Sequence, residues 1–218
     1  MERNRSLSSR RKIDNLLMNI YLRTILTIVG VQKFDSLLKY AHLEKYIDAF
    51  PPENDELEVP LTDLTYIYHS FFDLFAYKDP LNLQLTMGKK IMKYALAKFP
   101  DMINHIQVSS SLLSESEKMR LALEKFVEES EARWTSPFSG PHTILQEEEQ
   151  WFLIIEKDCF FSEDITSQTP VCFVYVGILE FLMQWITGHL HEVEEIECRA
   201  LGHPVDVFKI WKSSKEKN

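Results

Sequence analysis

Glycine is scarce in this chain: only six of its 218 residues are glycine. No GxGxxG or GxxxxGK[ST] run is present, and neither a Gly-x-Ser-x-Gly elbow nor a His-Glu-x-x-His sequence occurs. The usual sequence support for hydride transfer, phosphoryl transfer and serine hydrolysis is therefore missing. These absences favour a protein without catalytic activity, although they do not by themselves exclude an enzyme.

Long apolar runs are also missing. The longest, from Val171 to Ile186, is interrupted by Glu180 and Gln184 and falls short of the roughly 20 residues that a membrane span requires. The region after the basic start is broken by polar residues, and no small-residue cleavage site of the A-x-A kind follows it. We therefore expect neither a membrane span nor a signal peptide, and we expect a cytoplasmic protein.

Cysteine and positive charge are the other deficits. The three cysteines are an odd number, which in the cytoplasm is typical of thiols or metal ligands rather than of a disulfide framework. The net charge of −9 argues against a nucleic-acid-binding protein. One basic cluster is found within residues 1–12, which we expect to form a flexible solvated tail; contact with an anionic partner is the alternative.

Helical patterns dominate the region 13–135. Apolar residues recur at helical spacing, and prolines, glycine and capping residues mark the boundaries. Thr62 is a candidate N-cap, and Ser114 with Glu117 has the pattern of a capping box. The expected helices cover residues 13–30, 31–46, 62–79, 83–99 and 114–134.

The pattern changes after the turn-rich connector at 136–141. Residues 143–145 and 151–156 are predicted to form a β-hairpin, and the final strands are expected at about 190–200 and 205–212. Between the two pairs lies a helix over 170–187, with Thr169 as its cap and Pro170 at its first position. The sequence thus predicts an α+β fold: a helical N-terminal part, then β-β-α-β-β with a small antiparallel sheet packed on helices, and a polar tail at 213–218.

Four residues of metal-ligand type occur in the C-terminal part: Cys172, Glu195, Cys198 and Asp206. Cys172 is expected in the first turn of a helix, where free N–H groups and the helix dipole favour a thiolate. Glu195 and Cys198 are three residues apart, so a regular strand would place them on opposite faces. They can bind one ion only if the strand has a bulge or a strong twist. On spacing alone, buried cysteines beside a solvent-facing acidic strand are the simpler interpretation.

The wider pattern resembles the 4-vinyl reductase domain family. The resemblance rests on Pro170-Val171-Cys172, Gly177 and the run Glu195-x-x-Cys198-x-Ala200-x-Gly202-x-Pro204-x-Asp206-x-Phe208. It implies a domain over residues 136–212 that binds small molecules, with a fold similar to subunits of the TRAPP vesicle-tethering particles. The helical first half resembles the family only through the order of its helices.

The family resemblance also implies a zinc site. Its cysteine, glutamate and cysteine positions fall on Cys172, Glu195 and Cys198, but the last ligand position falls on Asp206 where the family has cysteine. A carboxylate is a harder ligand than a thiolate and favours a less thiophilic site. A weaker site, recruitment of His203, and a relic in which these residues only pack all stay open at this point.

Aromatic residues form the second set of candidates. An aromatic stripe at helical spacing usually belongs to a core, but the resemblance implies an apolar ligand chamber between helices and sheet. His69 could add polarity to it. His189 and His191 could form a metal pair, although exposed histidines at a strand start are the more common case, and Cys159 is interpreted as an ordinary thiol. The candidate chamber residues are Tyr68, Phe71, Phe72, Phe75, Tyr175 and Trp185.

Three functional hypotheses follow. The first is a cytoplasmic, non-catalytic domain that binds a small apolar or aromatic molecule, with a structural zinc at Cys172, Glu195, Cys198 and Asp206. The second, suggested by the family name, is a role in the vinyl reduction of tetrapyrroles such as bacteriochlorophyll, as the reductase or as an accessory protein. The third is a homodimeric scaffold with a vestigial pocket.

Overall fold

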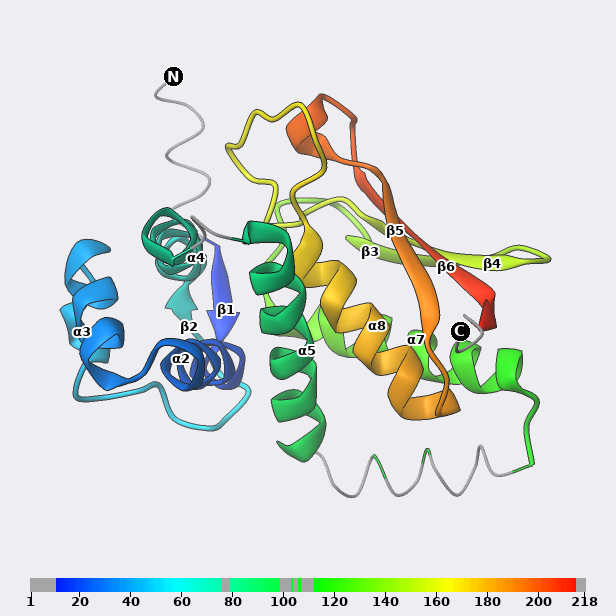
Figure 1. Cartoon of the computed structure of the whole chain (residues 1–218), viewed down its shortest axis with the longest axis horizontal. Coiled ribbons are helices and arrows are strands. Elements are labelled where there is room, and N and C mark those ends of the chain that lie inside the picture. Colours follow the sequence, from blue (N-terminus) through cyan, green and yellow to red (C-terminus); the bar gives the residue numbers. More distant parts are fainter. Residues whose placement is uncertain (1–10, 76–78, 99–102, 104–105, 107–111, 215–218) are drawn as a thin grey trace. The chain divides into compact units, whose positions relative to one another are not determined.

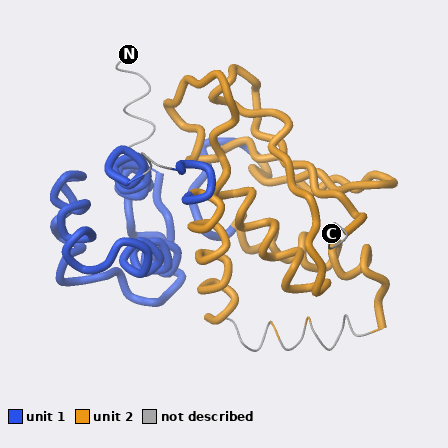
Figure 2. Tube along the Cα trace, viewed as in Figure 1, with its two compact units in different colours: residues 1–83, 132–139 blue, residues 84–131, 140–218 orange. Residues whose placement is uncertain are grey.

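The computed structural model describes residues 11–75, 79–98, 103, 106 and 112–214. Most of the predicted basic tail and residues 215–218 of the predicted polar tail lie outside these ranges. The chain divides into two compact units (Figure 2). Unit 1 consists of residues 1–83 and 132–139, and unit 2 of residues 84–131 and 140–218. No helix in the described ranges is both long and apolar enough to cross a membrane.

Unit 1 contains three helices and a two-stranded sheet. The helices are α2 (Asn15–Val29), α3 (Val31–Tyr40) and α4 (Leu61–Phe75), and a short 3-10 turn, η1, spans Glu44–Tyr46. Strands β1 (Lys12–Asp14) and β2 (Leu57–Pro60) pair antiparallel, with Ile13 opposite Val59. The sequence did not predict this sheet, because strands of three and four residues carry too little periodicity to be recognised.

Three helix boundaries in unit 1 differ from the predictions. The first helix begins at Asn15 because Asp14 is the N-cap and accepts a hydrogen bond from the Leu17 N–H. The second ends at Tyr40, and His42 adopts a φ of 57°, which no helix residue has. Thr62 is not an N-cap, since α4 begins at Leu61 directly after β2.

Unit 2 has an α+β architecture. Its sheet has the order β3-β4-β6-β5, and each neighbouring pair is antiparallel (Figure 1). Its strands are β3 (Thr143–Glu147), β4 (Trp151–Glu156), β5 (His191–Glu197) and β6 (Asp206–Ser214), with the 3-10 turn η2 at Arg199–Leu201. Its helices are α7 (Glu115–Arg133), α8 (Phe173–Thr187) and most of α5 (Pro80–Lys98). The predicted fold class, helices followed by β-β-α-β-β, is confirmed.

Helix starts in unit 2 test the capping predictions. The capping box is confirmed: the Ser114 N–H donates to Glu117 Oε2, and the Glu117 N–H donates to Ser114 Oγ. Helix α5 begins at Pro80 rather than near 83, because Asp79 accepts a hydrogen bond from the Asn82 N–H. Helix α8 begins at Phe173 with Cys172 as N-cap, so the predicted cap at Thr169 and first helical residue Pro170 are wrong.

One face of the sheet packs on α8. Phe152, Ile154 and Glu156 alternate as the buried side of β4, and each pairs with a buried residue of β6. The Tyr175 ring on α8 stacks on Phe208 of β6, with ring centroids 4.3 Å apart and an interplanar angle of 11°. In Figure 1, α8 runs along this face, and its first residue lies near the hairpin formed by β5 and β6.

Candidate metal centre

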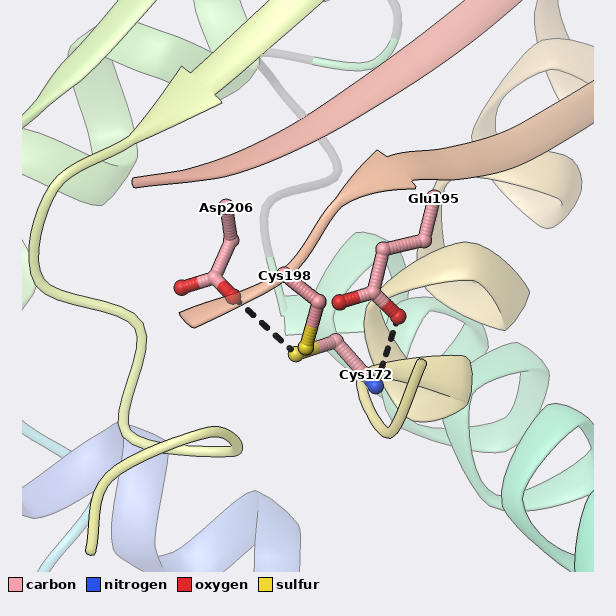
Figure 3. A group of neighbouring side chains, drawn as sticks. All are labelled: Cys172, Glu195, Cys198 and Asp206. Carbon is pink, nitrogen blue, oxygen red and sulfur yellow. Dashed lines mark hydrogen bonds between the residues drawn. The ribbon is translucent and has the colours of Figure 1, made fainter. Parts of the chain in front are cut away.

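Four buried side chains of metal-ligand type lie together at the start of α8. One ligand atom from each of Cys172, Glu195, Cys198 and Asp206 falls within 4.8 Å of every other. Cys172 is the N-cap of α8, Glu195 lies on β5, Cys198 follows β5, and Asp206 begins β6. In Figure 3 the two sulfur atoms are adjacent, with a carboxylate on either side.

A bulge in β5 brings Glu195 and Cys198 to one site. Glu195 pairs with Phe208 and Glu197 pairs with Val207, so the register between β5 and β6 shifts between these two positions. This is the irregularity that a spacing of three residues requires, because a bulge turns later side chains relative to the regular alternation. Cys198 then has extended backbone and precedes η2.

Glu195 links the helix start to the sheet and keeps one oxygen without a hydrogen bond. Its Oε2 accepts a hydrogen bond of 2.8 Å from the Cys172 N–H (Figure 3). Its Oε1 is buried and has no hydrogen-bond partner. Burial raises the pKa of this carboxyl, and the Cys198 and Cys172 groups beside it partly oppose that change.

The thiol of Cys172 lies between two others. The neighbouring thiols of Cys159 and Cys198, together with burial, raise the pKa of Cys172 far above its usual value. Burial also raises the pKa of Cys159, whose Sγ lies 3.9 Å from Cys172 Sγ. The expectation that the helix start would favour a Cys172 thiolate is therefore wrong for the metal-free protein: three clustered thiols and nearby carboxylates outweigh the helix dipole.

Asp206 is paired with Arg199. The Arg199 Nε donates to Asp206 Oδ2 at 2.9 Å, and the Arg199 backbone N–H donates to Oδ1 at 2.8 Å. The Ser162 hydroxyl donates to Oδ2 at 2.8 Å, and Cys172 Sγ lies 3.8 Å from Oδ1. Asp206 is fully buried, so this pairing provides the charge compensation that a buried carboxylate requires.

These residues fit a thiophilic divalent ion. Zinc sites combine thiolate and carboxylate ligands, and the unpartnered Glu195 Oε1 is an available acceptor in a buried site. A dication would also compensate the charge of thiolates that are otherwise held in the protonated state. Asp206 fits less well than the other three, because Arg199 and Ser162 already occupy much of its hydrogen-bonding capacity.

The predicted chamber residues fall into two groups, one in each unit. Tyr68, Phe71, Phe72 and Phe75 lie on α4 of unit 1 and contact one another through their rings, with Tyr68 and Phe71 buried. Tyr175 and Trp185 lie on α8 of unit 2. Tyr175 contacts Phe126, Phe161 and Phe208. A role of these residues in lining a ligand chamber stays a prediction.

The predicted histidine sites do not join the cluster. His189 Nδ1 lies 3.1 Å and His191 Nε2 lies 3.0 Å from Glu115 Oε1 at the start of α7. His203 is exposed, and its Nδ1 lies 4.0 Å from Glu197 Oε2. Within the described ranges, the group of metal-ligand side chains contains none of these histidines.

Sequence reasoning missed Glu156, Cys159 and Arg199. The Glu156 side chain is buried on the α8-facing side of β4, where Thr143 Oγ1 donates to it at 2.8 Å. The alternation of β4 could have revealed this burial, since Glu156 continues the series Phe152 and Ile154. No local signal marks Arg199, because its partners on residues 157–162 and 206 come together only in the fold.

The fold is similar to that of solved H-NOX structures. These include an H-NOX protein from S. oneidensis in the Fe(II)NO ligation state (12% identity, TM-score 0.55, covering 94% of this chain and 100% of the other). An unliganded Fe(II) H-NOX mutant from K. algicida gives 11% identity, a TM-score of 0.57, and coverage of 94% and 97%. An oxygen-binding H-NOX domain related to soluble guanylate cyclases gives 13% identity, a TM-score of 0.52, and coverage of 94% and 100%. At these identities the similarity establishes the fold alone.

Residues 151–212 match the family model of the 4-vinyl reductase domain, and this segment contains the whole four-residue cluster. The chain is thus an α+β protein with an H-NOX-like fold, and its C-terminal segment is a 4-vinyl reductase domain. The resemblance to that family is confirmed for the segment, while the likeness to TRAPP subunits stays a prediction. A comparison with curated proteins found no match.

Proposed function

We propose that this protein is a non-catalytic small-molecule-binding protein whose 4-vinyl reductase segment holds a structural zinc ion. The observation that carries the zinc proposal is the buried group Cys172, Glu195, Cys198 and Asp206, with the unpartnered Glu195 Oε1. The family match and the H-NOX-like fold support the binding of a small molecule, because the similar structures include an oxygen complex and H-NOX proteins that contain haem.

The ion would connect three parts of unit 2. Cys172 starts α8, Glu195 belongs to β5, and Cys198 precedes η2. A bond from each to one ion would fix the helix start against the β5–β6 hairpin. Asp206 is the fourth ligand that the family pattern assigns. A structural site of this type needs four ligands and no open position, so it would not itself activate water.

The small molecule would be apolar or aromatic, with few polar groups. The side chains around Tyr175 are mainly aromatic, and the buried Glu156 carboxyl lies within hydrogen-bond distance of the Tyr175 hydroxyl, at 3.4 Å. Such a combination of apolar surface with a few polar groups is typical of ligand sites. A cytoplasmic homodimer is part of this proposal and rests on the family resemblance alone.

Native mass spectrometry of protein purified from cells tests both parts of the proposal. We expect a mass increment for one zinc ion and a second increment for a small organic molecule. Elemental analysis of the Cys198→Ser variant should show loss of zinc. Glu197→Gln is the matched control, because this partly exposed residue neighbours Cys198 but lies outside the cluster. Unchanged zinc content in Cys198→Ser would contradict the assignment of the ligands.

Tetrapyrrole binding is the second candidate. It is favoured by the fold, since the similar structures include H-NOX proteins whose haem distortion and haem redox potential are under study. Absorbance spectra of the purified protein, before and after addition of haem, separate the two candidates. A Soret band with saturable binding would support a tetrapyrrole ligand, and a colourless organic molecule in the mass spectrum would support the first proposal.

A further inference from the structure

The third cysteine of the chain borders the candidate metal centre. Cys159 lies in the segment after β4, is buried, and belongs neither to the family pattern nor to the group of four. Its Sγ is 3.9 Å from Cys172 Sγ. In a tetrahedral zinc site with Zn–S bonds of about 2.3 Å, two sulfur atoms are about 3.8 Å apart. The two thiols therefore already have the separation of neighbouring zinc ligands.

Asp206 is poorly placed to give up its present partners. An ionised carboxylate has about four lone-pair sites. Three of those on Asp206 accept hydrogen bonds: from the Arg199 N–H, from Arg199 Nε and from the Ser162 hydroxyl. A metal bond to Asp206 would compete with a buried ion pair to Arg199. The Cys159 thiol has no such competing cation, and a thiolate is the softer ligand for zinc.

Arg199 connects Asp206 to the segment that contains Cys159. Its Nη1 donates to the Lys157 carbonyl at 3.3 Å, and its Nη2 donates to the Cys159 carbonyl. The Ser162 hydroxyl lies 3.2 Å from the Cys159 carbonyl as well as 2.8 Å from Asp206. The ion pair thus holds the backbone of residues 157–159 beside Cys172.

We propose that Cys159 supplies the fourth ligand, so that the ion is held by the thiolates of Cys159, Cys172 and Cys198 and by the Glu195 carboxylate. Asp206 and Arg199 act as a positioning pair that fixes the Cys159 segment. On binding, each of the three thiols releases its proton to solvent, and the dication compensates part of the new negative charge. This inference rests on the metal site of the proposed function and changes only its fourth ligand.

X-ray absorption fine structure of the zinc-loaded wild-type protein counts the sulfur ligands without any substitution. We expect three sulfur atoms at about 2.3 Å and one oxygen at about 2.0 to 2.2 Å. A shell of two sulfur and two oxygen atoms would overturn the role of Cys159 and leave the proposed zinc function intact. Failure of the wild-type protein to bind zinc at all would overturn both.

Cobalt(II) titration of the reduced, metal-free protein tests the same point through variants. Each bound thiolate adds to the thiolate-to-cobalt charge-transfer absorption in the near ultraviolet. Cys159→Ser should lose about one third of the wild-type intensity, as expected on going from three thiolates to two. Cys198→Ser calibrates the loss of one thiolate. Full wild-type intensity in Cys159→Ser, with a reduced intensity in Cys198→Ser, would rule out Cys159 as a ligand.

Discussion

Glu156 is a buried acid whose hydrogen-bond donors are all uncharged. Thr143 Oγ1, the Asp158 N–H and the Tyr175 hydroxyl donate to it, but burial is the larger effect and raises the pKa of Glu156 from 4.5 to about 8. The folded protein therefore keeps this carboxyl protonated at neutral pH, whereas the unfolded chain ionises it. Its contribution to stability is complete below about pH 4.5 and is lost as the pH rises through about 8.

Glu156→Gln should flatten the pH dependence of stability in that window. Glutamine resembles the protonated acid and does not titrate, so the variant lacks a stability loss of up to about 1.4 kcal/mol per pH unit. Urea unfolding at pH 5, 6.5 and 8 measures the difference from wild type, which should grow with pH in favour of the variant. Glu194→Gln, on the exposed face of β5, is the control for removing one carboxylate. A constant difference across the three pH values would contradict the assignment.

Arg199 has the opposite role, because it compensates a charge that stays buried. Asp206 has no exposed surface, and the Arg199 side chain is 23% exposed. In metal-free protein, Arg199→Met should cost about 3 kcal/mol, since it leaves an unpaired buried carboxylate. Adding Asp206→Asn should recover part of that loss. Both effects are read from urea unfolding in the presence of a chelator, and a double variant as unstable as the sum of the two single variants would show that the pair is not coupled.

The residues of the site were predictable only to the extent that sequence neighbours or a family pattern linked them. Cys172, Glu195, Cys198 and Asp206 were candidates before the fold was known, and the structure brings the four side chains together. Cys159 was interpreted as an ordinary thiol, because residues before α8 contact the cluster only through the tertiary hydrogen bonds of Arg199. Local sequence contains no trace of such bonds.

At the scale of elements, α5 and α8 approach each other through two glycines. A Cβ atom on Gly88 would lie 2.8 Å from the Ile178 N, and a Cβ on Gly177 would lie 3.0 Å from Leu85 Cα. The closest atoms in both cases are backbone carbonyl oxygens, Val174 O and Leu85 O. Neither backbone can move without separating the two helices, and the Lys89–Glu180 ion pair spans the same contact at 2.8 Å.

Alanine at either glycine should therefore destabilise the protein. In an isolated helix, Gly→Ala stabilises by about 1 kcal/mol, but overpacking of this kind costs about 1 to 3 kcal/mol and reverses the sign. Thermal unfolding of Gly88→Ala and Gly177→Ala measures the effect. Lys93→Ala, at an exposed position of α5, is the control for a helix-surface alanine. A raised melting temperature in either glycine variant would show that the helices separate at little cost.

Element boundaries were predictable where a local hydrogen bond sets them and not where a distant residue does. Ser114 and Glu117 fix the start of α7 within four residues, and the sequence identified them. The start of α8 was placed at Pro170, but the Cys172 N–H donates to Glu195, which lies 23 residues away, and the helix begins only afterwards. Strand β4 was predicted with both its ends, because its composition and alternation are local properties.

At the scale of the whole molecule, the candidate metal centre belongs to one of two compact units. All of its side chains, together with Cys159 and Arg199, come from unit 2. Unit 1 has its own core, formed by buried residues of α2, α3 and α4, and its own polar contacts, such as the Tyr46 hydroxyl donating to Asp63 at 2.7 Å. A structural ion should therefore stabilise the two units to different degrees.

Hydrogen exchange of zinc-loaded and chelator-treated protein tests this difference. An ion present at about 1,000 times its dissociation constant stabilises the state that binds it by about 4 kcal/mol. Chelation should speed exchange of the amides of α8 and the β5–β6 hairpin, and leave the slow amides of α2 and α4 nearly unchanged, because local openings of unit 1 break no bond to the ion. In Glu195→Gln, zinc should give little added protection. Equal acceleration in α2 and α8 would show instead that both units open in one cooperative step.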